Sequence, residues 1–228
     1  GTSIFKIFDM TVANTGFSYS EAVKKGYDVE VCHNIKPNKP EYLGGKEMVI
    51  KAIADKKTGR LLGVQIVGYE GVDKRIDVFA TAITFKAKVE DLFHLDLAYA
   101  PPFSTTKDPV MYTGMILENA ISKKAPLITA KELVDKHISS EDIHIIDARV
   151  EKQYKNGCVL NAENIPHAEI RERLKQLDKE KTIVTYCNKG VTGNAVQNIL
   201  INNGFKKVYN LSGGHKHFSK TNKDVTPQ

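Results

Sequence analysis

The segment TIVTYCNKGVTGNAVQNIL, residues 182–200, decides the fold of the second half of the chain. Its first five residues form a short apolar run that is typical of a buried strand. Gly190 and Gly193 then mark a tight loop, and apolar residues return at helical spacing from Ala195 to Leu200. The pattern therefore predicts a strand, a tight loop and a helix, with Cys187 at the junction of strand and loop.

The flanking sequence continues this alternation. Thr129 and Glu132 have the spacing of a capping box, which predicts the start of a helix. Strands are predicted at residues 144–148, 182–186 and 207–211, and helices at residues 131–138, 169–177 and 193–203. Strict alternation predicts an α/β fold with a parallel sheet covered on both faces. Ligands of such sheets bind at the carboxyl ends of the strands, where Cys187 lies.

The first half of the chain has a different pattern, for which we expect an α+β fold with a mixed sheet. Ser18 or Ser20 is expected to cap a short helix that ends near Gly26, and Asp108 caps a later helix that has Pro109 at its first position. Residues 4–16 and 27–35 are strand-like, residues 47–68 predict a β-hairpin that turns at residues 57–59, and residues 72–87 and 108–121 predict helices.

The domain boundary is expected near residue 125, where polar residues and Pro126 follow an apolar helical pattern. We therefore divide the chain into a first domain of residues 1–121, a linker of residues 122–126, a second domain of residues 127–220 and a tail of residues 221–228. The last ten residues, SKTNKDVTPQ, are expected to be frayed.

Composition and charge exclude several classes of protein. The 228 residues carry a net charge of +6, from 33 basic and 27 acidic residues that are interspersed along the chain. This mixing indicates a solvated surface and does not favour nucleic-acid binding. No apolar stretch approaches the ~20 residues of a membrane span, and no signal peptide is visible. The three cysteines are too few for a disulfide framework, so we expect a cytoplasmic protein.

A thiol at a strand end, before a tight loop and a helix, faces unpaired backbone N–H groups. Such groups and the helix dipole stabilise a negatively charged sulfur and any anion attached to it. The expected cradle consists of the loop residues Asn188, Lys189, Gly190, Val191, Thr192 and Gly193. We therefore take Cys187 as the candidate nucleophile. No metal site is expected, because His215 and His217 have no partner ligand at a suitable spacing.

Two classes of protein use such a cradle. A cysteine phosphatase carries an arginine six residues after its cysteine, but this chain has Gly193 there, which opposes that class and leaves it as a third alternative. The other class moves sulfur as a cysteine persulfide. Here the segments HIIDARVEKQYKNGCVLNAENIP, from His144, and YCNKGVTGNAVQNILINNGFKKVYNLSGG, from Tyr186, resemble the rhodanese family over residues ~127–218.

The resemblance implies that Cys187 carries the persulfide and that Asp147 and Arg149 support the loop. Many rhodaneses have arginines at the second and sixth loop positions, where this chain has Asn188 and Thr192. Lys189 is the one cation of the loop, so a larger substrate is easier to accommodate than thiosulfate. Cys158 is interpreted as a passenger rather than a resolving thiol.

The first half resembles the dimerisation domain of pyridine-nucleotide disulfide oxidoreductases, and within them the coenzyme A-disulfide reductase and NADH oxidase branch. The resemblance covers residues 1–121 and is most specific in LAYAPPFS, residues 97–104. It implies a homodimer in which this domain closes the partner subunit's active site. Tyr99 and, less closely, Tyr42 match the tyrosines that contact that site, whereas His94 is interpreted as structural.

Together the two resemblances imply the C-terminal portion of a coenzyme A-disulfide, persulfide or polysulfide reductase that uses FAD and NAD(P)H. No G-x-G-x-x-G fingerprint follows a predicted strand, so we expect no tight binding of FAD or NAD(P)H by this chain alone. The chain would then be a fragment or work beside another polypeptide. The alternative is a catalytically weak rhodanese fold that docks coenzyme A or a partner while the first half dimerises.

Overall fold

The computed structural model describes residues 1–139 and 141–222. The chain forms two compact units, of which the first spans Gly1–Ser122 and the second begins at Lys123. In the described ranges, none of the helices is long and apolar enough to cross a membrane.

The first unit contains a five-stranded antiparallel sheet with the order β1-β2-β5-β4-β3. Its strands are β1 (Thr2–Ile7), β2 (Met10–Gly16), β3 (Val29–Pro37), β4 (Glu47–Asp55) and β5 (Leu61–Gly68). The α+β class is confirmed, but the sheet is antiparallel throughout and the expected mixed sheet is wrong. Residues 4–16 form two paired strands instead of one, with a turn in which Phe8 has a positive φ of 51°.

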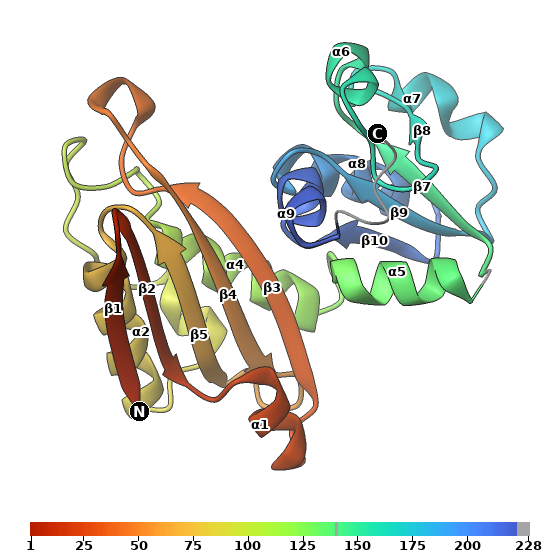
Figure 1. Ribbon diagram of the computed structural model, residues 1–228. Coiled ribbons are helices and arrows are strands. Elements are labelled where there is room, and N and C mark those ends of the chain that lie inside the picture. Colours follow the sequence, from red (N-terminus) through yellow and green to blue (C-terminus); the bar gives the residue numbers. More distant parts are fainter. Residues whose placement is uncertain (140, 223–228) are drawn as a thin grey trace. The chain divides into compact units, whose positions relative to one another are not determined.

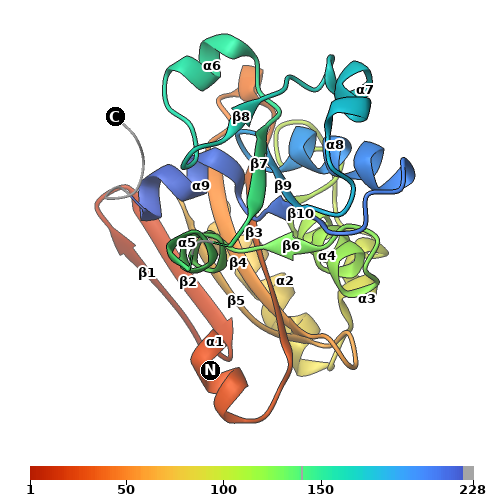
Figure 2. The ribbon, with the colours of Figure 1, turned by 90° about the vertical axis from the view of Figure 1, so that its right-hand side faces the viewer.

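Helices α2 (Val72–Thr84) and α4 (Pro109–Ile121) pack on one face of this sheet (Figures 1 and 2). The apolar stripe of α2 is buried through Ile76 and Phe79, as its spacing predicts. Asp108 accepts a hydrogen bond from the Val110 amide and so caps α4. The remaining helical segments are α1 (Tyr19–Lys24), which is capped by Ser18, the 3₁₀ turn Glu41–Leu43 and α3 (Val89–Phe93).

The second unit contains a parallel sheet with the order β6-β10-β9-β7-β8, which confirms the predicted α/β arrangement. Its strands are β6 (Leu127–Ile128), β7 (Ile143–Asp147), β8 (Glu163–Asn164), β9 (Thr182–Tyr186) and β10 (Val208–Leu211). Its helical segments are α5 (Ala130–Ile138), α6 (Glu151–Lys155), α7 (Ile170–Arg173), the 3₁₀ turn Leu174–Gln176, α8 (Val191–Asn202) and α9 (Gly214–Thr221).

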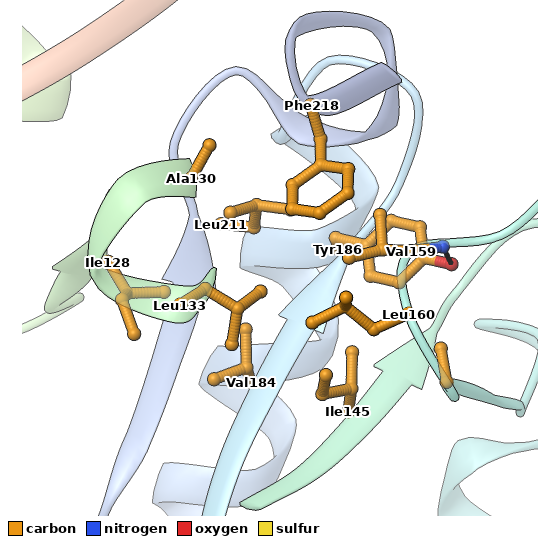
Figure 3. Close-up of a cluster of buried hydrophobic side chains, with 11 residues drawn as sticks. Ile128, Ala130, Leu133, Ile145, Val159, Leu160, Val184, Tyr186, Leu211 and Phe218 are labelled. Carbon is orange, nitrogen blue, oxygen red and sulfur yellow. Dashed lines mark hydrogen bonds between the residues drawn. The ribbon is translucent and has the colours of Figure 1, made fainter. Parts of the chain in front are cut away.

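Each face of the parallel sheet has its own apolar core. Figure 3 shows one of them, a cluster that contains Leu133 of α5, Phe218 of α9 and Val184 of the central strand. The other core joins Ile183 to Val196 and Leu200 of α8. Because the side chains of a strand alternate between faces, neighbouring residues of β9 serve opposite cores and hold the strand between two helical layers.

Helix α9 was not predicted from the sequence. The segment from Ser219 was expected to be frayed, but the helix extends to Thr221. Residues 223–228 of that tail lie outside the described residues. The first turn of α9 contacts the Cys187 loop through backbone hydrogen bonds.

Candidate functional site

Cys187 lies where β9 ends and the loop to α8 begins. The residue is buried, with 6% of its surface exposed, and it lines a cleft of about 470 Å³. The cleft is lined by Ala148, Arg149, Val150, Gln153, Pro166, His167, Ala168, Cys187, Asn188, Lys189, Val191 and Thr192. The sequence-predicted loop and Arg149 therefore share one cleft at the carboxyl edge of the sheet.

The Cys187 loop, residues 187–193, is held in shape by backbone and side-chain hydrogen bonds. Gly190 has a φ of 99° and accepts hydrogen bonds at its carbonyl from the Asn194 amide at 2.9 Å and from Asn210 Nδ2 at 3.0 Å. Thr185 Oγ1 donates to the Gly193 carbonyl at 2.9 Å. A β-carbon on Gly193 would lie 2.9 Å from the Tyr186 Cα atom. Glycine is required at this position because the helix start packs directly on the strand end.

Asp147 and Arg149 form a buried ion pair at the end of the neighbouring strand β7. Arg149 Nη2 lies 2.6 Å from Asp147 Oδ2 and also donates to the Gly157 carbonyl at 2.7 Å. Burial alone would lower the pKa of Arg149, but the hydrogen bond and charge of Asp147 raise it above its ordinary value. The guanidinium thus remains protonated, and its positive charge is balanced by Asp147. This arrangement suits a supporting role better than anion binding.

Tyr186 connects this ion pair to the strand that carries Cys187. Its hydroxyl donates to Asp147 Oδ2 at 2.6 Å and accepts from the Val159 amide at 3.0 Å. Burial and the hydrogen bond to Asp147 raise the pKa of Tyr186 well above its ordinary value. The phenol therefore stays protonated and donates to Asp147, and this hydrogen bond joins the ends of β7 and β9.

The other two thiols lie in less reactive surroundings. Burial raises the pKa of Cys32 to about 12, and burial followed by the charge of Asp147 raises the pKa of Cys158. Cys158 Sγ donates to the Leu160 carbonyl at 3.4 Å. No group of three or more potential metal ligands occurs within residues 1–139 and 141–222.

Tyr42 and Tyr99 are both exposed on loops of the first unit, with 78% and 50% of their surfaces accessible. Both loops are anchored by Arg75 of α2, which is 2% exposed. Its Nη2 atom lies 3.0 Å from the Asn38 carbonyl and 2.8 Å from Asp108 Oδ2. One guanidinium therefore fixes the start of the Tyr42 loop and the end of the Tyr99 loop.

Sequence reasoning missed Arg75, Asn210 and the N-terminal turn of α9. Arg75 is a charged residue in an amphipathic helix, where a solvent-exposed position is the usual expectation. Its buried position between two loops depends on residues 33 and 37 positions away in the chain, so no local signal indicates it. Asn210 lies in a strand next to Leu211, and polar residues at a strand end give no specific pattern.

Two family descriptions match the chain. Residues 2–109 match the dimerisation domain of the pyridine nucleotide-disulphide oxidoreductases, and residues 129–221 match the rhodanese-like domain. Both resemblances inferred from the sequence motifs are thereby confirmed.

Curated relatives match about half of the chain. An NAD(P)H sulfur oxidoreductase (CoA-dependent) of Pyrococcus furiosus is 44% identical over 119 residues, which are 52% of this chain and 27% of the relative. A coenzyme A disulfide reductase of Staphylococcus epidermidis is 36% identical over 115 residues, which are 50% of this chain and 26% of that relative. The match thus spans about a quarter of each curated relative.

Solved structures match both halves together. The reduced CoADR-RHD of Bacillus anthracis has a TM-score of 0.94 and 33% identity over 100% of this chain and 41% of that one. An NAD-dependent persulfide reductase from A. fulgidus has a TM-score of 0.82 and 34% identity over 94% of this chain and 38% of its own. The two units therefore occur in the same order in longer proteins of known structure.

Proposed function

Because the chain contains a dimerisation domain of the pyridine nucleotide-disulphide oxidoreductases followed by a rhodanese-like domain, we propose that it belongs to a reductase of coenzyme A disulfides, persulfides or polysulfides. In this proposal the second unit handles sulfane sulfur as a persulfide on Cys187. The observation that carries it is the position of Cys187 in a cleft at a strand end, facing a glycine-bounded loop that starts a helix.

The proposed transfer requires no net oxidation or reduction. The Cys187 thiolate attacks the outer sulfur of a persulfide or polysulfide, the S–S bond breaks, and the donor leaves as a thiolate or a polysulfide one sulfur shorter. An acceptor thiolate then attacks the outer sulfur of the Cys187 persulfide and restores the Cys187 thiolate. The loop amides bind the negative charge at both stages, which is the contribution of this chain.

The walls of the cleft favour a donor with an organic arm. Ala148, Val150, Pro166, Ala168 and Val191 give it apolar walls, and Asn188, Thr192 and Gln153 add neutral polar groups. Because Arg149 is paired with Asp147, a small inorganic dianion gains little from its charge. A thiol such as coenzyme A brings its own apolar and polar contacts and fits this lining better.

FAD would supply the transfer of two electrons from NAD(P)H that reduces a persulfide to a thiol and sulfide. We propose that residues outside this chain bind both cofactors. In this parallel sheet, the phosphate of a cofactor could bind at the tight turn between β9 and α8. That turn instead holds Cys187, and its backbone packs closely on Tyr186 and Asn210. The chain would supply the sulfur carrier, and its Tyr99 and Tyr42 would contact the partner subunit's site.

We propose that the first unit forms a homodimer in the cytoplasm. Its β1–β2 hairpin exposes apolar side chains, and Phe8 is 94% exposed. The exposed apolar residues of this hairpin are Ile4, Phe5, Ile7, Phe8 and Met10. Such a patch favours association over contact with water. Light scattering at micromolar concentration is expected to give the dimer mass, and a monomer would contradict this part of the proposal.

The direct test is cyanolysis after exposure to polysulfide. The wild-type chain is expected to release stoichiometric thiocyanate, and Cys187→Ser to release none while its circular dichroism is unchanged. Cys158→Ser is the matched control and should load as the wild type does. Loading that survives in Cys187→Ser, or is lost only in Cys158→Ser, would contradict the proposal.

A second candidate is a binding module that docks coenzyme A without transferring sulfur. It is favoured by the neutral Asn188 and Thr192 at loop positions where many rhodaneses have arginines. Calorimetric titration separates the two candidates. Binding of coenzyme A to a chain that acquires no cyanolysable sulfur supports the module, whereas loading at Cys187 supports the carrier.

A further inference from the structure

We propose that the first turn of α9 orients the amides of the Cys187 loop, which makes Gly214, His215 and Lys216 positioning residues for the sulfur on Cys187. The inference rests on the proposed function for the nature of the bound group. Its geometric part stands on the backbone contacts between α9 and the loop.

Two hydrogen bonds join α9 to the loop. The His215 amide donates to the Cys187 carbonyl at 2.8 Å, and the Lys216 amide donates to the Asn188 carbonyl at 3.0 Å. These are the first two carbonyls of the loop, and both are bound by one helical turn. The orientation of two successive peptide planes is thus fixed from outside the loop.

The consequence follows from the geometry of the peptide bond. In a planar trans peptide the carbonyl and the N–H point in opposite directions. When the Cys187 and Asn188 carbonyls point toward α9, the Asn188 and Lys189 amides point away from it. Cys187, Asn188 and Lys189 line the cleft. In the proposal, the Asn188 and Lys189 amides face the sulfur of Cys187 in that cleft.

The close approach of α9 to the Cys187 loop depends on Gly213 and Gly214, which precede His215. Gly213 has a φ of 77° and Gly214 a φ of 58°, both in the left-handed region. A β-carbon on Gly214 would collide with the Cys187 carbonyl oxygen and lie 2.9 Å from the Asn188 carbonyl carbon. The backbone of α9 can therefore reach the loop only when residue 214 has no side chain.

Helix α9 is packed on the second unit through Phe218 and His215, so it can act as a template for the loop. Phe218 is fully buried in one of the two cores of the second unit (Figure 3). The His215 ring stacks on Tyr186 with a centroid separation of 6.5 Å, and its Nε2 atom is buried with no partner among the described residues. Burial, followed by the charge of Arg149, lowers the pKa of His215. This shift favours a neutral ring beside the Asp147–Arg149 ion pair.

The first test compares two glycine substitutions in the same unit. Gly214→Ala should slow iodoacetamide alkylation of Cys187 at pH 7 by about tenfold and move its pH profile to higher pH, as expected for the loss of hydrogen bonds to a charged group. Gly204→Ala is the matched control, because Gly204 also has a positive φ of 87° but its β-carbon would approach only Lys179 Nζ, at 3.6 Å. A folded Gly214→Ala chain with an unchanged profile would overturn the proposal.

A second measurement uses the wild-type chain and does not depend on how the variant folds. When polysulfide loads Cys187, the amide proton resonances of Asn188 and Lys189 should move downfield more than those of the rest of the loop. Cys187→Ser is the control and should show no such shifts. Loading that leaves both amides unmoved would contradict the inference.

The two tests also distinguish this inference from the proposed function. Alkylation does not require sulfur transfer, so a wild-type chain that fails to load sulfur but shows the expected Gly214→Ala profile refutes the proposed function alone. A chain that loads sulfur but shows an unchanged Gly214→Ala profile refutes the positioning role alone.

Discussion

The Cys187 loop and the two tyrosine loops of the first unit are built in different ways. In the Cys187 loop, backbone carbonyls and amides make the decisive contacts, and glycines at positions 190, 193 and 214 permit them. In the first unit, Tyr42 and Tyr99 project into solvent from loops that are fixed by the buried side chain of Arg75. The Cys187 loop is thus positioned mainly by main-chain contacts, and the two tyrosine loops by one buried side-chain ion pair.

The difference has consequences for substitution. A main-chain cradle is disturbed mainly by changes that add a β-carbon, because its donors belong to every residue. A loop held by one guanidinium fails when that side chain is lost, because the buried partner charge is then left uncompensated. The two tyrosine loops should therefore be more sensitive to loss of a single charged side chain, Arg75, than the main-chain contacts of the Cys187 loop.

The largest expected effect is that of Arg75→Met on the stability of the first unit. The substitution leaves Asp108 buried without its cation, which costs about 3–5 kcal/mol in comparable cases. Urea unfolding followed by tyrosine fluorescence should show an earlier transition for the first unit and an unchanged one for the second. Lys88→Met breaks an exposed pair with Glu90 and is the control, with an expected change below about 1 kcal/mol. Equal effects of the two substitutions would contradict the comparison.

Tyr186→Phe tests the corresponding side-chain link in the second unit. It removes the donor to Asp147 and the acceptor of the Val159 amide, at an expected cost of about 1–3 kcal/mol. The loop amides remain in place, so alkylation of Cys187 should change little. A large loss of Cys187 reactivity at unchanged stability would mean that the cradle depends on this side chain more than on its backbone.

The pH dependence of stability should reveal the buried Asp108 carboxylate of the first unit, with a smaller effect. Burial alone would raise the pKa of Asp108, but hydrogen bonds from Arg75 and Ser104 hold it below its ordinary value. A lowered folded-state pKa gives stability that is complete above the unfolded value of about 3.9 and is lost as the pH falls further. The urea midpoint of the first unit should therefore fall as the pH is lowered from 5 to 3. Asp108→Asn should flatten that dependence, and an equally steep curve would contradict the assignment.

The smallest expected effect is that of Ser18→Ala at the start of α1. The side chain accepts from the Glu21 amide in an exposed capping box, so its loss should cost about 1 kcal/mol. Neither dimerisation nor Cys187 reactivity should change. An effect as large as that of Arg75→Met would show that the first unit does not depend chiefly on its buried ion pair.

The same contrast explains what the sequence could predict. The strand, loop and helix around Cys187 are marked by local signals, and the caps at Ser18, Asp108 and Thr129 are present as predicted. Helix α9 was missed because it has only one large buried apolar residue, Phe218, and begins at a pair of glycines, Gly213 and Gly214. The hairpin within residues 4–16 was missed because its turn uses Phe8 in a left-handed conformation, where Gly or Asn is the usual signal.

The anchor formed by Arg75 illustrates the limit of local reasoning. It joins Asn38 and Asp108, which are 70 positions apart in the numbering, and nothing near either residue indicates the pairing. The roles of Cys187, Tyr42 and Tyr99 stay predictions. Cys187 lies in a cleft, and both tyrosines are exposed.

The central claim is that Cys187 carries sulfane sulfur. Peptide mass spectrometry of the wild-type chain after brief exposure to polysulfide, followed by alkylation, tests it most directly. We predict one added sulfur on the peptide that contains Cys187, none on those that contain Cys32 or Cys158, and complete removal by cyanide. Added sulfur on Cys158, or on none of the three cysteines, would contradict the account.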